Sequence, residues 1–252
     1  MTAAGFIVTS PQYLQLLVGG VQQPFILNQP KGGDFSIEFY GVGADTTWSD
    51  SRVYWLVVGT SSAAKVRPVN ESPMTFATSS FPYTVERKDR TFFFSALKNG
   101  EADNFFGPSV TPSGRDWALT LKNIDAVSRD ASIEVRLQGF TLLPHRVNVT
   151  LNGIGLGEIN YNNQDQGFAQ FTVSQAMLRE GENHVVMTAM GGGSDLSLVV
   201  SVRVTYWHRY KADDNSLRFA ANGREQVTVE GFTTGDIRVV DVTSPNAPHK
   251  AP

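Results

Sequence analysis

Three segments in the second half of the chain decide the fold: His145–Gly153 (HRVNVTLNG), Leu178–Val186 (LREGENHVV) and Val202–Tyr206 (VRVTY). The first segment alternates apolar and polar residues and ends in Asn-Gly, the dipeptide that type I′ hairpin turns prefer. The second segment places a Gly-x-Asn corner in front of a further apolar strand. This succession of strands and turns is typical of an antiparallel jelly-roll sandwich, and it carries no set of residues suited to covalent or metal chemistry.

The alternating pattern continues on both sides of these segments and predicts an all-β protein. A polar connector, residues 122–130, places a boundary near residue 125. We therefore predict two β-sandwich domains, residues 1–125 and 126–212, the second of them a jelly roll of the galactose-binding-like kind. Residues 213–252 are expected to add short strands and a linker towards a further domain.

Apolar runs in the first half indicate where a core would form. Val53–Val58 is apolar throughout, so we expect this strand to be buried on both sides. Trp55 and Phe92–Phe94 lie in apolar strands and are expected in the core. Gly19-Gly20 predicts a hairpin turn, and residues 59–80, rich in Ser, Ala and Thr, predict a loop.

The composition excludes several classes of protein. The chain has 252 residues, 41% of them hydrophobic and 18% charged, which suits a folded chain rather than a disordered one. Its formal net charge of −3 and the lack of a basic stripe give no reason to expect nucleic acid as a partner. No run reaches the ~18–20 apolar residues that cross a bilayer, so no membrane insertion is expected.

The chain contains no cysteine. No disulfide can therefore hold the fold, and no thiolate nucleophile exists. The first residues have neither a basic nor an apolar region of the kind that marks a signal peptide.

Several segments, in order along most of the chain, resemble a known family. They are Phe39–Gly41 with Thr46–Leu56 (TTWSDSRVYWL), Asn99–Phe106, the HRV.V.LNG..LG and L.EG.N.V pair, Val204–Tyr210, Leu217–Phe219, Val229–Phe232 and Asp236–Pro245. Together they are similar to the non-catalytic β-sandwich region that precedes the catalytic domain in gingipain-type bacterial cysteine peptidases.

The resemblance implies a bacterial protein located outside the cell or on its surface. It implies an accessory segment that positions a downstream catalytic domain or contacts a surface protein, with Asp241–Pro245 as the linker. The His and Cys of the family's catalytic dyad would lie downstream, so none of the four histidines carries that role over. This chain is therefore not expected to be an enzyme by itself, although its parent protein would be a cysteine peptidase. We further expect Leu217–Val242 to dock the neighbouring domain, because short strands at a chain end leave unpaired edges.

Two kinds of binding site remain open. Calcium prefers hard oxygen ligands, and these cluster at Asp45, Asp50, Glu101 and Asp103 and again at residues 213–215. Asp and Asn also suit turns, which is the interpretation we favour. No other cofactor is expected, since neither a zinc ligand spacing nor a nucleophile motif is present.

The alternative function is that of a carbohydrate-binding module. Trp48, Tyr161 and Trp207 are candidate stacking platforms, and Asn163 is a candidate hydrogen-bonding partner for a glycan. Of these, Tyr161 in a polar stretch is expected to be the most exposed. Gly191–Asp195 is expected to be a flexible hairpin loop. His145 and His184 would lie close together if their strands pair.

Overall fold

The structure, a computed structural model, describes residues 8, 10–29, 34–46, 49–68, 75–100 and 102–251. The chain divides into two compact units. The split unit consists of residues 1–72 and 236–252, and the sandwich unit consists of residues 73–235. Strands predominate in both units, which confirms the predicted all-β class. No helix in the described part of the chain is long and apolar enough to span a membrane.

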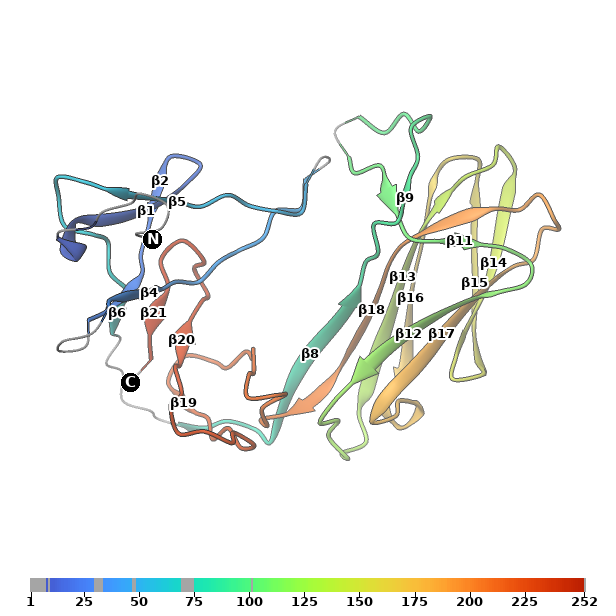
Figure 1. Cartoon of the computed structure of the whole chain (residues 1–252). Helices are drawn as coiled ribbons and strands as arrows, with labels where there is room; N and C mark the ends of the chain where they lie inside the picture. The colour runs from blue at the N-terminus through green and yellow to red at the C-terminus, as the bar shows by residue number, and fades with distance from the viewer. Residues whose placement is uncertain are drawn as a thin grey trace. The chain divides into compact units, whose positions relative to one another are not determined.

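The sandwich unit is built from two antiparallel sheets that face each other (Figure 1). One sheet has the order β11-β18-β13-β16, with β8 also paired to β18, and the other has the order β12-β17-β14-β15. The strands of the first sheet are β8 (Ser80–Arg87), β11 (Ser109–Val110), β13 (Asp130–Gly139), β16 (Gln166–Ser174) and β18 (Ser197–Arg209). Those of the second are β12 (Arg115–Leu121), β14 (Pro144–Leu151), β15 (Ile154–Asn162) and β17 (Gly181–Ala189). The jelly-roll sandwich predicted for the second half of the chain is confirmed.

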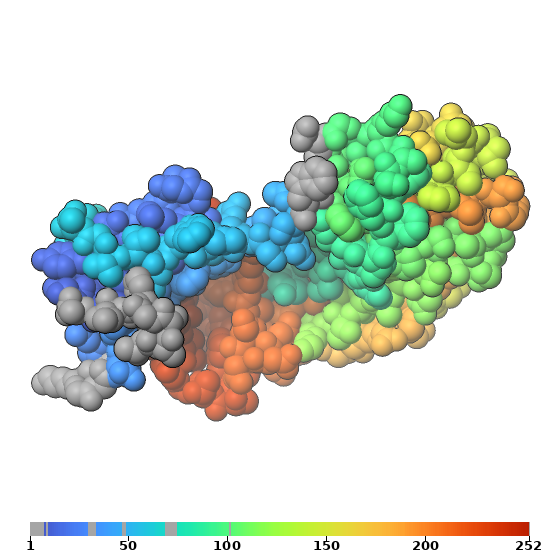
Figure 2. All heavy atoms as spheres, turned by 45° about the horizontal axis from the view of Figure 1, so that its top comes forward, coloured from blue at the N-terminus to red at the C-terminus, as the bar shows by residue number. Residues whose placement is uncertain are grey.

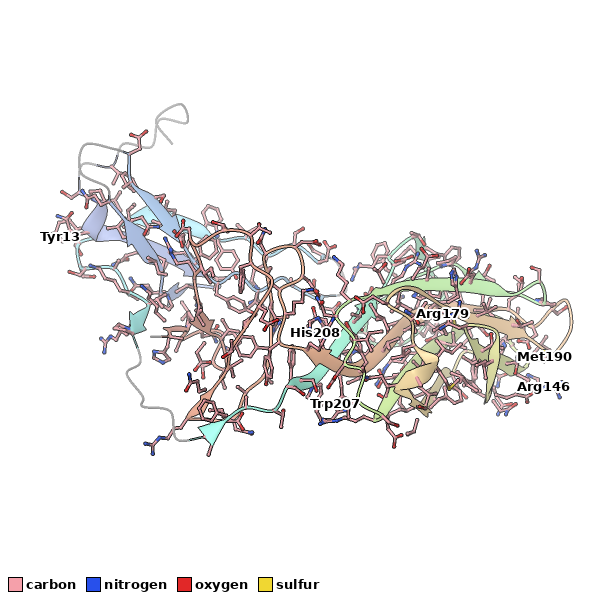
Figure 3. All side chains as sticks on the ribbon, turned by 90° about the horizontal axis from the view of Figure 1, so that it is seen from below. Tyr13, Arg146, Arg179, Met190, Trp207 and His208 are labelled. Atoms are coloured by element: carbon pink, nitrogen blue, oxygen red, sulfur yellow. The ribbon has the colours of Figure 1, made fainter. Side chains whose placement is uncertain are left out.

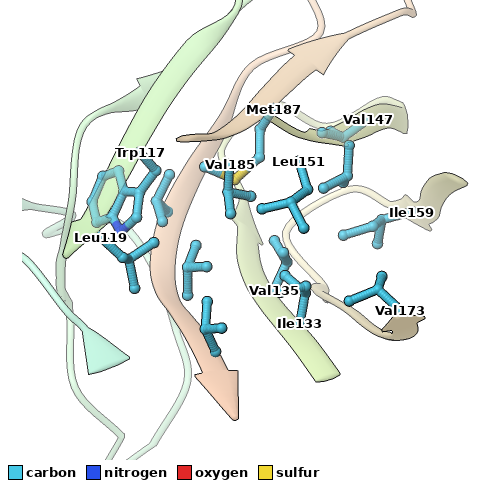
Figure 4. Close-up of a cluster of buried hydrophobic side chains, with 14 of the residues drawn as sticks. Trp117, Leu119, Ile133, Val135, Val147, Leu151, Ile159, Val173, Val185 and Met187 are labelled. Carbon is cyan, nitrogen blue, oxygen red and sulfur yellow. The ribbon is translucent and has the colours of Figure 1, made fainter. Parts of the chain in front are cut away.

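The core between these sheets follows from the alternation along each strand. In β13, Ala131, Ile133, Val135 and Leu137 are buried, whereas Arg136 between two of them is exposed. Equivalent residues of the facing sheet complete the cluster drawn in Figure 4, where Trp117 of β12 lies at one side. Each Val, Ile or Leu side chain contributes about 1.5–3 kcal/mol when it is fully buried. The cluster therefore holds the sandwich together in the absence of disulfides.

The turn between β14 and β15 forms as the Asn-Gly dipeptide predicts. Asn152 and Gly153 both have positive φ, 51° and 87°. This combination is the one that a type I′ turn requires. The turn fixes the register in which Leu151 pairs with Ile154. An irregularity between Val149 and Thr150 then shifts the register by one residue, so that Arg146 pairs with Asn160.

The split unit consists of small sheets around a core of Leu14, Leu16 and Phe25. After a 3₁₀ turn, η2 (Pro11–Tyr13), a hairpin forms with Gly19 and Gly20 at positive φ, as predicted. The described residues of the split unit form three sheets. The first contains β1 (Leu14–Val18), β2 (Val21–Gln23) and β5 (Trp55–Val58), and the second contains β3 (Ile26–Asn28) and β4 (Ser36–Glu38). The third contains β6 (Arg67–Pro68), β20 (Val240–Asp241) and β21 (His249–Lys250). Because β21 pairs with β6, the last described residues belong to the same unit as the first.

Two further pairs and one turn complete the sandwich unit. They are β7 (Thr75–Phe76) with β19 (Glu225–Gln226), β9 (Phe92–Phe93) with β10 (Phe105–Phe106), and the 3₁₀ turn η3 (Gln175–Met177). The last of these lies between β16 and β17. Leu217–Phe219, which lies in the segment expected to add short strands, has no strand structure.

The division of the chain differs from the boundary predicted near residue 125. Strands β8, β11 and β12 precede that position, yet they pair with β18 and β17 of the sandwich unit. Residues 236–252 return to the first unit instead of forming a linker with residues 213–235. Local composition marks a polar connector well, but strand pairing over long distances in sequence decides which segments share a core.

The prediction that Val53–Val58 is buried on both sides is wrong. Val53, Trp55 and Val58 are 62%, 64% and 50% exposed, and only the intervening Tyr54 and Leu56 pack on the core. The reason is that β5 is the edge strand of a three-stranded sheet with one covered face. Phe92 and Phe93 are likewise exposed, whereas the neighbouring Phe94 is buried as expected.

Candidate functional site

An open groove of about 570 Å³ lies at one end of the sandwich unit. It is lined by Leu143, Pro144, His145, Arg146, Asn160, Tyr161, Asn162, Met190 and Gly191. Arg146 and Met190 lie together there, at the end away from Trp207 and His208 (Figure 3). In the space-filling view, yellow-green residues of β14 and β15 and orange residues around 190 share this end of the surface (Figure 2). Its volume is within the range of about 300–1,000 Å³ that ligand pockets have.

Strand register decides which side chains reach the groove. His145 pairs with Tyr161 and Arg146 pairs with Asn160 across β14 and β15. Since successive side chains of a strand point to opposite faces, Arg146 and Asn160 face outward, and His145 and Tyr161 face the core. The groove therefore has a polar outer wall, its floor is the surface of β14 and β15, and the His145 and Tyr161 side chains lie beneath that floor.

Beneath the floor, His145 forms a buried ion pair with Asp195. The two residues are 2% and 1% exposed, and Nδ1 of the histidine lies 2.6 Å from Oδ1 of the aspartate. The other ring nitrogen, Nε2, lies 2.9 Å from the carbonyl oxygen of Asn163 and 3.1 Å from that of Thr141. Because all of these partners only accept hydrogen bonds, the geometry favours a ring that donates from both nitrogens, which is the imidazolium form.

The same pair connects the loops around the groove. The second carboxylate oxygen of Asp195 accepts hydrogen bonds from the backbone N–H groups of Gly191 (2.9 Å) and Arg146 (3.3 Å). The Thr141 hydroxyl adds a bond of 2.9 Å to the carbonyl of Ser194. Residues 191–195, expected to be a flexible loop, are thus anchored by a buried carboxylate.

Close approach of two backbones makes this arrangement possible. A Cβ atom on Gly139 would lie 1.8 Å from the carbonyl oxygen of Asn163 and 2.9 Å from Nε2 of His145. Only glycine fits there, so Gly139 allows the turn at Asn163 to reach the histidine.

Ser197 lies next to the His145–Asp195 pair, but the three do not form a catalytic triad. The serine Oγ and the aspartate both lie on the Nδ1 side of the ring, at 3.5 Å and 2.6 Å. In a triad the nucleophile and the acid bind opposite nitrogens of the histidine. Here Nε2 is occupied by carbonyl groups, and Ser197 is fully buried. The cluster can hold loops in place, but it cannot attack a substrate.

Tyr161 is not the exposed platform that its polar surroundings suggest. Its ring stacks on His145, with centroids 4.9 Å apart and planes at 27°, and its hydroxyl donates to Ser197 Oγ. Its other contacts include Gly167, where a Cβ atom would meet the ring at 2.4 Å. Burial raises the pKa of the Tyr161 hydroxyl above its usual range.

The other residues proposed for glycan binding lie apart or are already engaged. Asn163 does reach the site, although through its backbone carbonyl and with φ of 51° in the turn after β15. Trp207 is half-buried at the far end of the unit, and the Arg129 guanidinium lies 4.0 Å from its ring centroid. Trp48 lies outside the described residues.

The residues proposed for calcium belong to different units or lie outside the described residues. Asp103 accepts a hydrogen bond from Arg90 Nη1 at 2.6 Å and one from the Phe105 backbone at 2.8 Å, so its charge is already compensated. Asp45 and Asp50 belong to the other unit, and Glu101 lies outside the described residues. Among residues that the structure describes, no group of three or more His, Asp or Glu side chains is arranged to hold a metal ion.

A second buried histidine occupies the other end of the sandwich unit. His208 is fully buried; its Nδ1 bonds to the Arg209 carbonyl, and its Nε2 lies 3.1 Å from Asp213 Oδ2. Asn123 donates to the other oxygen of Asp213 at 2.6 Å. His184, by contrast, lies on the outer surface between Asp116 and Glu182. It is therefore not close to His145, because the two side chains leave opposite faces of the same sheet.

The fold and this site define the class of protein: an all-β chain with a jelly-roll sandwich and an end groove above a buried ion pair. No protein-family model matches the chain, and no curated protein matches it. In structure it is similar to dimeric latent PorU from Porphyromonas gingivalis, with a TM-score of 0.68 and 9% sequence identity. The similarity covers 99% of this chain and 27% of that chain, so the chain spans about a quarter of PorU's length.

Weaker similarities involve only about half of the chain. One is to the CBM36-1 domain of a multidomain xylanase from the hindgut metagenome of Trinervitermes trinervoides, with a TM-score of 0.32 and 11% identity over 49% of this chain and 96% of that one. Another is to a family 35 carbohydrate binding module from Clostridium thermocellum, with a TM-score of 0.27 and 14% identity over 53% and 98%. Both scores are too low to establish a shared fold.

Sequence reasoning missed the Asp195 partner of His145. The two residues are 50 positions apart, and Asp195 follows a glycine-rich stretch that is typical of a surface loop. One signal was available: the alternation that makes Val147, Val149 and Leu151 face inward also makes His145 face inward. A histidine at a core-facing position needs a hydrogen-bonding partner from another segment.

Proposed function

We propose that this chain is a non-catalytic accessory segment of a larger bacterial protein of the gingipain peptidase type, located outside the cell or on its surface. In this proposal it supports or positions a neighbouring catalytic domain, or contacts a surface partner. The observation that supports it is the similarity in fold to PorU. That similarity covers 99% of this chain but only 27% of PorU, which is the longer protein. The sequence resemblance to the region before a gingipain-type catalytic domain points the same way.

The chemistry of the described residues supports a role without catalysis. The chain has no cysteine. Both fully enclosed histidines, His145 and His208, use their ring nitrogens to bind acceptors within the fold. The exposed His184 lies between two carboxylates, with no hydroxyl nucleophile bonded to it among the residues that the structure describes.

Carbohydrate binding remains the second candidate, and the end groove is the observation that favours it. Its exposed amides, Asn160 and Asn162, can both donate and accept hydrogen bonds, as sugar hydroxyls require. The partly buried ring of Tyr161, stacked on His145, argues against it, because sugar binding by stacking needs an exposed aromatic face.

The test uses the parent reading frame with and without this segment. We expect removal of the segment to lower the melting temperature and the yield of the neighbouring domain, and the isolated chain to show no peptidase activity. The matched control keeps the segment but carries Val135→Asp, which places a charge in the sandwich core and disrupts it. This variant should lower the melting temperature and the yield of the neighbouring domain as the deletion does. A neighbouring domain that folds equally well in all three forms would contradict the accessory role.

A further inference from the structure

We propose that the end groove of the sandwich unit binds an extended peptide segment that carries an acidic side chain beside an apolar one. This inference rests on the proposed function, since it names the chemistry of the partner that an accessory segment would contact. Four features of the groove carry it: two unengaged amides, one guanidinium, an apolar rim and a preorganised floor.

The amides suit a polypeptide backbone. Asn160 and Asn162 are exposed, line the groove and make no hydrogen bond with their side chains to another described residue. They lie two positions apart on β15, so both are on the same face of the strand, about 6.6–6.8 Å from each other. An extended peptide presents equivalent groups at the same spacing, and an Asn side chain has the donor and acceptor of a peptide group.

The guanidinium of Arg146 supplies the preference for an acidic residue. Its side chain is 52% exposed, and its ion partner in the described structure is Glu158, with Nε and Oε2 3.7 Å apart. Exposed pairs of this kind contribute little to stability, so a ligand carboxylate can replace Glu158 at little cost. A guanidinium also binds a carboxylate through two parallel hydrogen bonds, which fixes its orientation.

The rim supplies the preference for an apolar residue. Leu143 and Met190 are 41% and 45% exposed and line the groove beside Arg146. Methionine adapts its shape to varied partners, which suits a site that accepts different aliphatic side chains. An apolar residue two positions from the acidic one would lie on the same side of an extended peptide.

The floor explains why the groove is preorganised. A buried ion pair is a weak source of stability, because desolvation offsets its attraction. The His145–Asp195 pair nevertheless binds the backbone at Thr141, Asn163 and Gly191, which are the three loops beside the groove. Loops held in place before binding lose less conformational entropy when a ligand arrives.

A glycan fits these features less well than a peptide. The aromatic residue of the groove, Tyr161, has its ring stacked on His145 and packed against Gly167. A guanidinium beside an apolar rim gives a neutral sugar no matching charge. The groove thus offers directional hydrogen bonds, one positive charge and an aliphatic contact, as a peptide with an acidic and an apolar residue requires.

The experiment screens an array of ten-residue peptides against the full chain and measures the affinity of selected peptides by fluorescence anisotropy. We expect the bound sequences to carry Asp or Glu two positions from an aliphatic residue, and Asn or Gln twins to bind at least about tenfold more weakly. Arg146→Gln should lose a similar factor, and Glu158→Gln should bind more tightly. The matched control is Arg203→Gln, which breaks a similarly exposed pair with Glu86 (3.3 Å) on the other sheet and should leave the affinity unchanged.

Two outcomes would overturn the inference. One is an array in which acidic peptides bind no better than their amide twins, or in which Arg146→Gln and Arg203→Gln behave alike. The other is saturable binding of a neutral oligosaccharide that Asn160→Ala abolishes and Arg146→Gln does not, which would make the groove a glycan site. Either result would leave the accessory role intact as long as deletion of the segment still destabilises the neighbouring domain, so the two proposals fail separately.

Discussion

Replacement of Asp195 by Asn should destabilise the sandwich unit far more than its conservative size suggests. The substitution removes the negative charge that faces the His145 imidazolium, and both side chains are at most 2% exposed. Breaking one side of a buried ion pair costs about 3–5 kcal/mol, because the remaining charge is left without compensation. For a domain of this size, with about 2–4 °C per kcal/mol, the melting temperature should fall by about 6–20 °C.

The assay is a double-mutant cycle with His145→Gln, followed by equilibrium unfolding in guanidinium chloride and by calorimetry. Because the double variant leaves no unpaired charge, it should be more stable than the sum of the single effects by at least about 2 kcal/mol. Additive effects, or a loss below about 1 kcal/mol for Asp195→Asn alone, would refute the charged pair. The ring would then be neutral, and the cluster would contribute as ordinary hydrogen bonds.

Three further predictions concern other positions. Gly139→Ala should cost about 2 kcal/mol or more in the free energy of unfolding, because its Cβ would meet a carbonyl oxygen at 1.8 Å; Gly155→Ala, with open space around it, is the control and should change little. Burial raises the pKa of the Tyr161 hydroxyl above 10.0, so the contribution of this group to stability is complete below that pH and is lost as the pH rises beyond it. Between about pH 8 and 11 the free energy of unfolding should therefore fall less steeply with pH in Tyr161→Phe than in the unmodified protein, and identical slopes in the two proteins would contradict the assignment. Trp55→Ser at a 64% exposed position should shift the unfolding free energy by less than about 0.5 kcal/mol, whereas Leu16→Ala in the same unit should cost about 2–5 kcal/mol; a larger loss for the tryptophan would mean that its ring is covered in solution.

The strands and turns of the sandwich were predictable because their signals are local. Alternation along Ala131–Gly139 and the Asn152-Gly153 turn both appear in the structure as expected. Burial was predicted less well where one run of apolar residues fits two situations. The apolar run Val53–Val58 predicts a strand covered on both faces, but an edge strand of a small sheet buries only alternate residues.

The candidate site was predictable only in part. Tyr161 was named and lines the groove, and Asn163 was named and lies in the adjoining turn. Their roles differ from those expected, because the Tyr161 ring is partly buried and Asn163 acts through its carbonyl group. Arg146 and Met190 gave no signal, because a single exposed cation and a single exposed methionine are common on any surface.

The sequence by itself determined the all-β class, the strand alternation and the tight turns, since each depends on residues within a few positions of one another. It also determined that no thiol chemistry is available. Only the tertiary structure decided that residues 236–252 complete the first unit and that Asp195 lies under His145. Those facts depend on which distant strands pair, and pairing is selected by the free energy of the whole core rather than by any local pattern.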